Sequence, residues 1–309
     1  MNVPYRVYDV FAESPFAGTQ IAVVLADADI DERLKVQIAA EFNHSDTVFV
    51  DTSNKTSPFS VYNERGKTGF GAHTTLAAAQ TAHELGMSRP EDGYFEYELQ
   101  DNGRMVDTFV DNNMDNSIEK PASKQSMALY SRTFDFTTDR YVPELSSIAD
   151  ALAVDVKHLA YARYKPRLVR VDTPVLVVPM TRPEHVLAAR LDSGRWSSLL
   201  SEIYASYILL IARGSVSGRA DFHGRLMHPE LKPNEYPPIG SVIPEFIAYL
   251  CSCEETSRGT HTVTIDRGGH KSRQSLIRAE FDYTGGSQVK CRIGGRVLLM
   301  AEGSFVYAD

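Results

Sequence analysis

The amino-acid sequence predicts an α+β protein made of two similar halves. Its 309 residues are too many for one small hydrophobic core and suit two domains of about 150 residues each. Each half contains several predicted strands, a loop with glycine, one apolar helix and then further strands. With 43% hydrophobic and 23% charged residues, the composition is that of an ordinary globular protein.

A helix in the first half has recognisable start and stop residues. Asp31 is suited to cap its N-terminus, and an apolar stripe at helical spacing runs from there to Asn43, which suits a left-handed end. A short strand is predicted directly afterwards, at residues 47–50. Residues 44–46, which end at Asp46, therefore lie on a helix-to-strand junction, a place where functional residues often occur.

The rest of the first half is predicted as strands around one central helix. The glycine-rich segment 65–72 opens a helix from His73, which Gly86 ends. The small residues Ala77–Ala79 indicate that this helix is closely packed on all sides. The predicted strands are 5–11, 21–25 and 59–64, with a hairpin of strands 94–99 and 105–110 that turns at Asn102-Gly103.

The second half repeats this order after a polar stretch at about 112–138, which we interpret as the connection between domains. Helices are predicted at 146–153, 183–190, 195–204 and 243–250, the last opened by a loop that contains Gly240. Strands are predicted within 168–180 and at 207–212, 262–266, 275–283, 288–293 and 297–302. Gly285-Gly286 and Gly294-Gly295 are predicted to form tight turns between the last strands.

Composition and motifs exclude several functional classes. A formal charge of −8 argues against a nucleic-acid binder. No apolar run is long enough to span a membrane, and no secretory signal opens the chain, so we expect a cytoplasmic protein. The three cysteines have no disulfide spacing, and no metal-ligand spacing is present. A P-loop would need glycine at Val61, and a dinucleotide fingerprint would need glycine at Thr74. From these missing motifs and the missing metal-ligand spacing, we expect no cofactor and no metal.

Six segments in order along the chain resemble the phenazine-biosynthesis isomerase-like family, which shares its fold with diaminopimelate epimerase. These are YDVFAESPFAGTQIAVVL at 8–25, FNHSDTVFV at 42–50, FGAHTTLAAA at 70–79, VDTPVLVVPM at 171–180, MHPELKPNEYPPIGSV at 227–242 and the C-terminal VTIDRGG…IGGRVLLMAEG. The resemblance covers nearly the whole chain.

The resemblance implies that each domain wraps a strongly curved, mostly antiparallel sheet around a central helix, with the active-site cleft between the domains. Domains are expected at 1–115, completed by a C-terminal strand at about 296–309, and at 141–295, with a connection at 116–140. Both helix N-termini would point into the cleft, where backbone N–H groups and the helix dipole hold a carboxylate or enolate charge.

The resemblance also implies a cofactor-independent isomerase that shuttles a proton on a small metabolite. Asp46 matches the family's shuttling glutamate, one methylene shorter, and His73 matches a family histidine that supports it. The residues assigned to substrate binding are Thr19, Gly71, Ala72, Thr74, Glu235, Tyr236, Gly240 and Ser241. The expected partners are a small-molecule substrate and a second copy of the chain in a homodimer, with no nucleic acid and no membrane.

This chain departs from the family pattern at several cleft positions. Tyr236 stands in place of the aspartate that assists the proton relay, and Ile239 in place of a threonine. Such changes remove polar groups and suggest a larger or more apolar ligand. Two alternatives therefore stay open beside the isomerase. One is a cleft in secondary metabolism that promotes cyclisation or rearrangement of an apolar intermediate by positioning it. The other is a ligand-binding homologue without catalysis.

Overall fold

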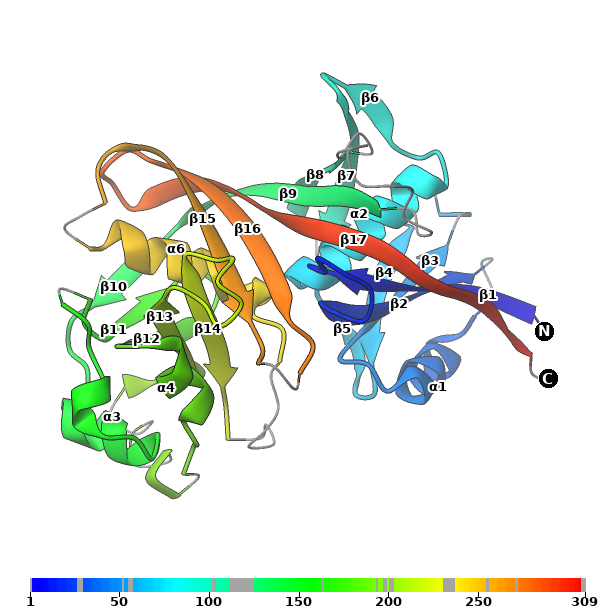
Figure 1. Cartoon of the computed structure of the whole chain (residues 1–309). Helices are drawn as coiled ribbons and strands as arrows, with labels where there is room; N and C mark the ends of the chain where they lie inside the picture. Colours follow the sequence, from blue (N-terminus) through cyan, green and yellow to red (C-terminus); the bar gives the residue numbers. More distant parts are fainter. Residues whose placement is uncertain are drawn as a thin grey trace. The chain divides into compact units, whose positions relative to one another are not determined.

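The chain folds into two compact units (Figure 1). Unit 1 comprises Met1–Arg132 and Ile293–Asp309, and unit 2 comprises Thr133–Arg292. The computed structural model describes residues 2–26, 30–51, 53–54, 58–101, 104–111, 125–162, 164–192, 194–196, 199, 203–229, 237–253, 256–269 and 272–306. Glu235, Tyr236, the predicted turn Asn102-Gly103 and parts of 116–140 and 195–204 lie outside these residues.

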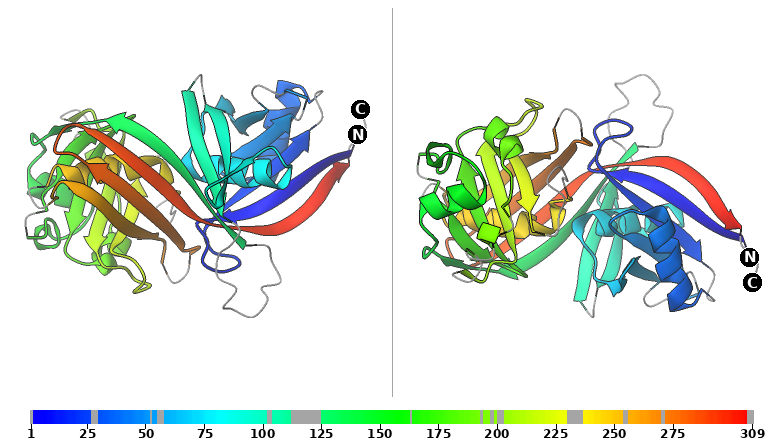
Figure 2. Two further views of the ribbon diagram at one scale, coloured as in Figure 1. Left: turned by 90° about the horizontal axis from the view of Figure 1, so that it is seen from above. Right: turned by 90° about the horizontal axis from the view of Figure 1, so that it is seen from below.

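Unit 1 is built on a mixed sheet of strands β1 (Asn2–Val10), β2 (Thr19–Ala26), β3 (Thr47–Asp51), β4 (Phe59–Asn63) and β5 (Gly66–Thr68). The β2–β3 pair is parallel, and the β1–β2, β3–β4 and β4–β5 pairs are antiparallel. β1 also pairs with the long strand β17 (Gln288–Val306), and the two run alongside one another in every view (Figure 1, Figure 2).

Helices cover both faces of this sheet. Helix α1 (Glu32–Phe42) begins as predicted, because the Asp31 carboxylate accepts the N–H of Leu34 at 2.7 Å, and it ends at Asn43 with φ 52°. Its side chains pack with Val24 and Phe49 on one face. Helix α2 (Ala72–Glu84) is central to unit 1, since it contacts β1, β2 and β3 as well as the hairpin strands β7 and β8.

The remaining strands of unit 1 form an antiparallel series. These are β6 (Arg89–Glu91), β7 (Tyr94–Asp101), β8 (Arg104–Asp111) and β9 (Gln125–Asp135), each paired with the next. The predicted hairpin is therefore present as β7 and β8. Because α2 lies among strands on several sides, all of its residues from Ala72 to Ala82 are buried, which explains the run of alanines.

Unit 2 repeats the order of unit 1 with strands β10 (Thr137–Asp139), β11 (Arg167–Arg170), β12 (Pro174–Met180), β13 (Tyr207–Arg213), β14 (Phe222–Met227), β15 (Gly259–Arg267) and β16 (Ser275–Tyr283). As in unit 1, a parallel pair, β12–β13, lies between antiparallel neighbours. The helices are α3 (Leu145–Ala151), α4 (Pro183–Ala188) and α6 (Ile243–Cys251), with short turns η1 (Val156–His158) and η2 (Gly240–Val242).

Helix α6 is the counterpart of α2 in unit 2. Every residue of α6 is buried, and it contacts β10, β11, β12 and β16. Helix α4 contacts β12, β13 and β14, whose residues Leu176, Leu210 and Met227 form one core with Val186. Each unit therefore has a sheet and one central helix that is buried over most or all of its length, a small α+β architecture repeated along the chain.

The expected connection at 116–140 contains strands, and one predicted turn is wrong. Within the connection, residues 125–135 form β9, which pairs with β8 from Asp107↔Ser131 to Asp111↔Met127, and residues 137–139 form β10. Gly294-Gly295 is no turn, because β17 runs through it without a break. A Cβ atom on Gly294 would lie 2.5 Å from the Ala128 carbonyl oxygen, so this glycine allows β9 to approach closely.

Among the described residues, no helix has both the length and the apolar character needed to cross a membrane.

Candidate active site

Asp46 lies in the short segment between the end of α1 and the start of β3. Asn43 ends α1 in the left-handed conformation, and Thr47 is the first residue of β3. In the parallel pairing of β2 and β3, Ala22 lies opposite Thr47. Asp46, just before Thr47, and Thr19, the first residue of β2, therefore lie at the same end of these two parallel strands.

A buried carboxylate organises the loop that leads to Thr19. Asp9 is 1% exposed, and its Oδ2 accepts the N–H of Phe16 at 2.9 Å. Gly18 has φ +70°, and a Cβ atom there would lie 2.3 Å from the Val10 carbonyl oxygen, so only glycine fits this turn. The sequence signal for this role is an acidic residue, Asp9, inside an apolar strand.

The N-terminus of α2 is left open by its own sequence. The cap residue is Gly71, which has no side chain to accept the first N–H groups of the helix. The Thr74 hydroxyl instead accepts the N–H of Gly71 and donates to its carbonyl oxygen, both at 2.9 Å. The first helical bond runs from the N–H of Thr75 to Gly71 at 2.9 Å. Within the described part of the chain, the N–H groups of Ala72, His73 and Thr74 have no partner.

This arrangement separates the predicted binding residues of α2 into two kinds. The Thr74 side chain is buried and its hydroxyl is used on Gly71, so it holds the cap in place. Gly71, Ala72 and the backbone of Thr74 provide the open helix end. Because the helix dipole is positive there and N–H groups point outward, this end favours a bound anion.

The Asp46 carboxylate and the His73 imidazole meet at this helix end. Asp46 Oδ2 lies 3.2 Å from His73 Nε2, and the side chains are 20% and 8% exposed. Ser45 Oγ is 3.4 Å from the same nitrogen. Neutral histidine that donates from Nε2 to a carboxylate leaves Nδ1 as an acceptor. His73 Nδ1 is buried and has no partner among the described residues.

The pair is therefore suited to proton transfer. A carboxylate in a partly dry site, fixed by an imidazole and next to open N–H donors, can remove a proton while the helix end stabilises the negative charge that develops. Ser45 was placed at the junction by the sequence but was not assigned to the site. Its contact with His73 depends on the tertiary structure, because 28 residues separate them.

The predicted binding residues of unit 2 precede α6. Gly240 is buried and Ser241 is exposed, and both belong to η2. Ile239 is only 1% exposed, and its Cδ1 lies 3.0 Å from the position of a Cβ atom on Gly224. Ile239 therefore packs against β14. The threonine-to-isoleucine difference from the family pattern adds to the core of unit 2.

A buried carboxylate supports the first turn of α6. Glu245 Oε1 accepts the N–H groups of Asp172 and Thr173 at 3.1 and 3.2 Å. Burial raises the pKa of Glu245. These hydrogen bonds hold α6 against the turn between β11 and β12, so Glu245 has a structural role that explains its burial.

Metal-ligand clusters and cysteine thiols are two other kinds of group that could carry chemistry. Among the residues that the structure describes, no cluster of three or more His, Cys, Asp or Glu side chains is arranged to hold a metal ion. Cys251, Cys253 and Cys291 are buried and form no disulfide, and burial raises the pKa of Cys251 to about 12. A thiol with that pKa stays protonated and is a poor nucleophile.

Comparison with known proteins gives a consistent result. The family model described as "Phenazine biosynthesis-like protein" matches residues 8–303. An uncharacterized isomerase from Mesorhizobium japonicum is 26% identical over 97% of both chains. The fold is similar to that of a PhzF-family phenazine biosynthesis protein from Bacillus anthracis, with a TM-score of 0.81, 15% identity and coverage of 99% and 100% of the two chains. A predicted epimerase from Pseudomonas aeruginosa has a TM-score of 0.72, with 22% identity and 99% coverage of each chain.

Proposed function

Since this chain belongs to the phenazine biosynthesis-like protein family, we propose that it is a cofactor-independent isomerase that moves a proton between carbon atoms of a small metabolite. The observation that carries the proposal is the 3.2 Å contact between Asp46 and His73 beside the open N-terminus of α2. The names of its relatives, an isomerase and a predicted epimerase, agree with this class of reaction.

In the proposed reaction, Asp46 is both the base and the acid. Its carboxylate removes a proton from an acidic carbon of the substrate, and the electron pair delocalises over the substrate as an enolate-like anion. The protonated Asp46 then returns the proton to another carbon of the same delocalised system and becomes a carboxylate again. Atoms and electrons balance without an oxidant, a reductant or a cofactor.

His73 positions this carboxylate, and the N–H groups of Ala72 and His73 stabilise the anion. An N–H donor aimed at developing charge is worth about 10²- to 10³-fold in rate. These roles need a substrate that carries an electron-withdrawing group, such as a carboxylate, next to the acidic carbon.

The test is proton NMR of the purified protein in D₂O with dihydro-hydroxyanthranilate, the substrate that the family resemblance suggests. We expect isomerisation with deuterium incorporation, lowered about 10²- to 10⁴-fold by Asp46→Asn. The matched control is Asp31→Asn, which makes the same chemical change at the α1 cap, where asparagine caps as well as aspartate does. Full activity of Asp46→Asn would disprove the shuttle, and no conversion by the wild-type protein would disprove the substrate.

The alternative of a positioning cleft for an apolar intermediate receives less support from the described residues. The apolar difference at Ile239 motivated it, but this side chain is buried against Gly224. In that alternative, Asp46→Asn would cost little activity on an apolar substrate. A homologue that only binds ligands would show no turnover with any substrate that it binds.

A further inference from the structure

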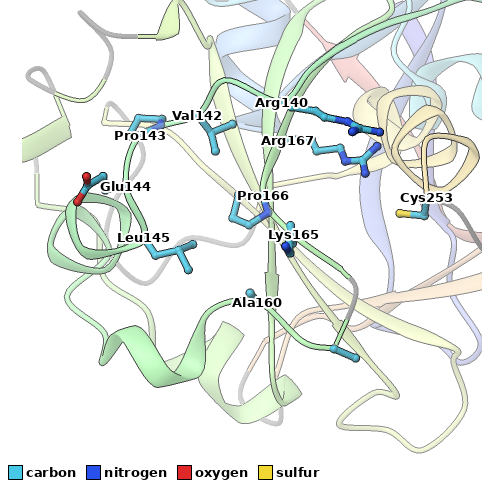
Figure 3. A pocket seen from close by; sticks show the side chains of 11 residues that line it. Arg140, Val142, Pro143, Glu144, Leu145, Ala160, Lys165, Pro166, Arg167 and Cys253 are labelled. Carbon is cyan, nitrogen blue, oxygen red and sulfur yellow. The ribbon is translucent and has the colours of Figure 1, made fainter.

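A cavity in unit 2 lies apart from Gly240 and Ser241, the candidate site residues of the same unit. Its volume is about 790 Å³, within the range of small-molecule sites in proteins. The lining comes from the segment between β10 and α3, from the segment that leads into β11, and from Cys253 beyond α6 (Figure 3). Gly240 precedes the other end of α6. The helix has nine residues and so is about 13 Å long, which separates the cavity from Gly240.

The lining of this cavity has an excess of positive charge. It contains Arg140, Lys165 and Arg167 but one acidic residue, Glu144. In Figure 3 the guanidinium groups of Arg140 and Arg167 extend in the same direction, toward Cys253, whereas Glu144 lies at the opposite side. With three cations and one carboxylate, the lining has a formal charge of +2 in a chain of net charge −8.

The cations are not neutralised within the described part of the chain. Arg167 donates from Nη1 to the carbonyl oxygen of Ser252, the C-cap of α6, which uses one edge of its guanidinium group. Arg140 and Lys165 have no ion pair and no side-chain hydrogen bond among the described residues. Like charges held in one cavity repel each other, so an anion bound between them would remove this cost.

The other part of the lining is apolar. It consists of Val142, Pro143, Leu145, Ala160, Ala162 and Pro166. Leu145 is 38% exposed, which leaves apolar surface for a ligand to cover. A ligand that matches both parts carries an anionic group and an apolar body.

We propose that this cavity is a second binding site, which takes a small organic anion with a carboxylate or phosphate group on an apolar body. The anionic group pairs with Arg140, Lys165 and the free edge of Arg167, and the body lies on Val142 and Leu145. Arginine forms bidentate pairs with either group, so the shared chemistry is that of a planar or tetrahedral oxyanion. The site does not depend on the function proposed for Asp46.

The experiment is methyl NMR of the full-length protein, titrated with benzoate and phenyl phosphate. The methyl signals of Val142 and Leu145 report on this cavity alone, so binding of either anion elsewhere does not confuse the result. Benzyl alcohol tests the apolar body without charge, and inorganic phosphate tests the charge without the body. We expect at least one aromatic anion to shift these signals at lower concentration than both partial probes.

The double variant Arg140→Gln/Lys165→Gln should weaken this binding at least about tenfold, since it removes two charge-assisted contacts. Both side chains are exposed, so the fold is expected to survive, and unchanged Tm checks this. Lys290→Gln, an exposed cation of β17 in the same unit, is the matched control and should bind as the wild type does. Unshifted Val142 and Leu145 signals, or full binding by the double variant, would overturn the proposal.

Discussion

Gly71 gives a sharp test of the open helix end, because capping it should raise stability and lower activity together. Gly71 has φ −94° and ψ 172°, a conformation that any N-cap residue adopts. A Cβ atom there would lie 3.4 Å from His73 Cε1, which is an ordinary contact. Gly71→Asp therefore fits without strain. Its carboxylate is expected to accept the N–H of His73 or Thr74, the bond that glycine leaves unmade.

The expected gain in the free energy of unfolding is about 0.5–1 kcal/mol, from a better cap and a negative charge at the helix N-terminus. This corresponds to a rise in Tm of about 1–4 °C. The same carboxylate occupies the place of the substrate anion and repels it. Loss of donors of this kind costs about 10²- to 10³-fold in rate, so isomerase activity should fall by at least that factor.

Gly71→Ala is the matched control, because alanine adds the same Cβ atom but has no acceptor. It should lower the free energy of unfolding by about 0.5–1 kcal/mol, since alanine is a poor cap. It leaves the N–H groups open, so activity should stay within about tenfold of the wild type. Thermal unfolding and the NMR isomerisation assay measure both effects. The reasoning is refuted if Gly71→Asp keeps full activity or if the two variants lose activity equally.

Three further predictions concern other positions. Ser45→Ala should lower isomerase activity by less than about threefold, because its 3.4 Å contact with His73 is weak; a loss as large as that of a missing base would contradict this. Gly294→Ala should lower the free energy of unfolding by about 1–3 kcal/mol, because the added Cβ would lie 2.5 Å from a backbone oxygen. Gly303→Ala should lower it by less, because the added Cβ there would meet the Tyr5 side chain. Equal losses of stability in denaturant unfolding would contradict this. Burial lowers the pKa of His223. As the pH falls below about 6.5, this histidine is therefore protonated in the unfolded chain but not in the native state. Stability should fall between pH 7 and pH 5 for this reason, less steeply in His223→Gln, and an unchanged slope would argue against it.

Local interactions made part of the fold predictable. The cap at Asp31, the left-handed end at Asn43 and the strand that follows depend on residues within one or two turns, and all three are present. The hairpin of β7 and β8 and the buried helix α2 were predicted from alternation and from small residues. The family resemblance placed Asp46 and His73 in one site, and their 3.2 Å contact agrees with it.

Other features depend on partners far away in the sequence. The two glycines at 294–295 look like a turn, but one of them faces Ala128 of β9, which no local pattern reveals. The polar stretch at about 112–138 shows no strand pattern, yet its residues 125–135 form β9, because pairing with β8 decides their structure. Ile239 looked like a change in the binding site, yet its burial against Gly224 makes it a core residue.

The sequence by itself determined the α+β class, the order of the main elements, the helix caps and the residue types available for proton transfer, because these follow from periodicity, capping and side-chain chemistry. Only the tertiary structure decided that Ser45 and Asp46 contact His73. It also decided that the Thr74 hydroxyl is hydrogen-bonded to Gly71, and that Arg140, Lys165 and Arg167 line one cavity. The physical reason is that strand pairing and helix packing bring together residues far apart in the sequence, and local sequence patterns do not show which distant residues will meet.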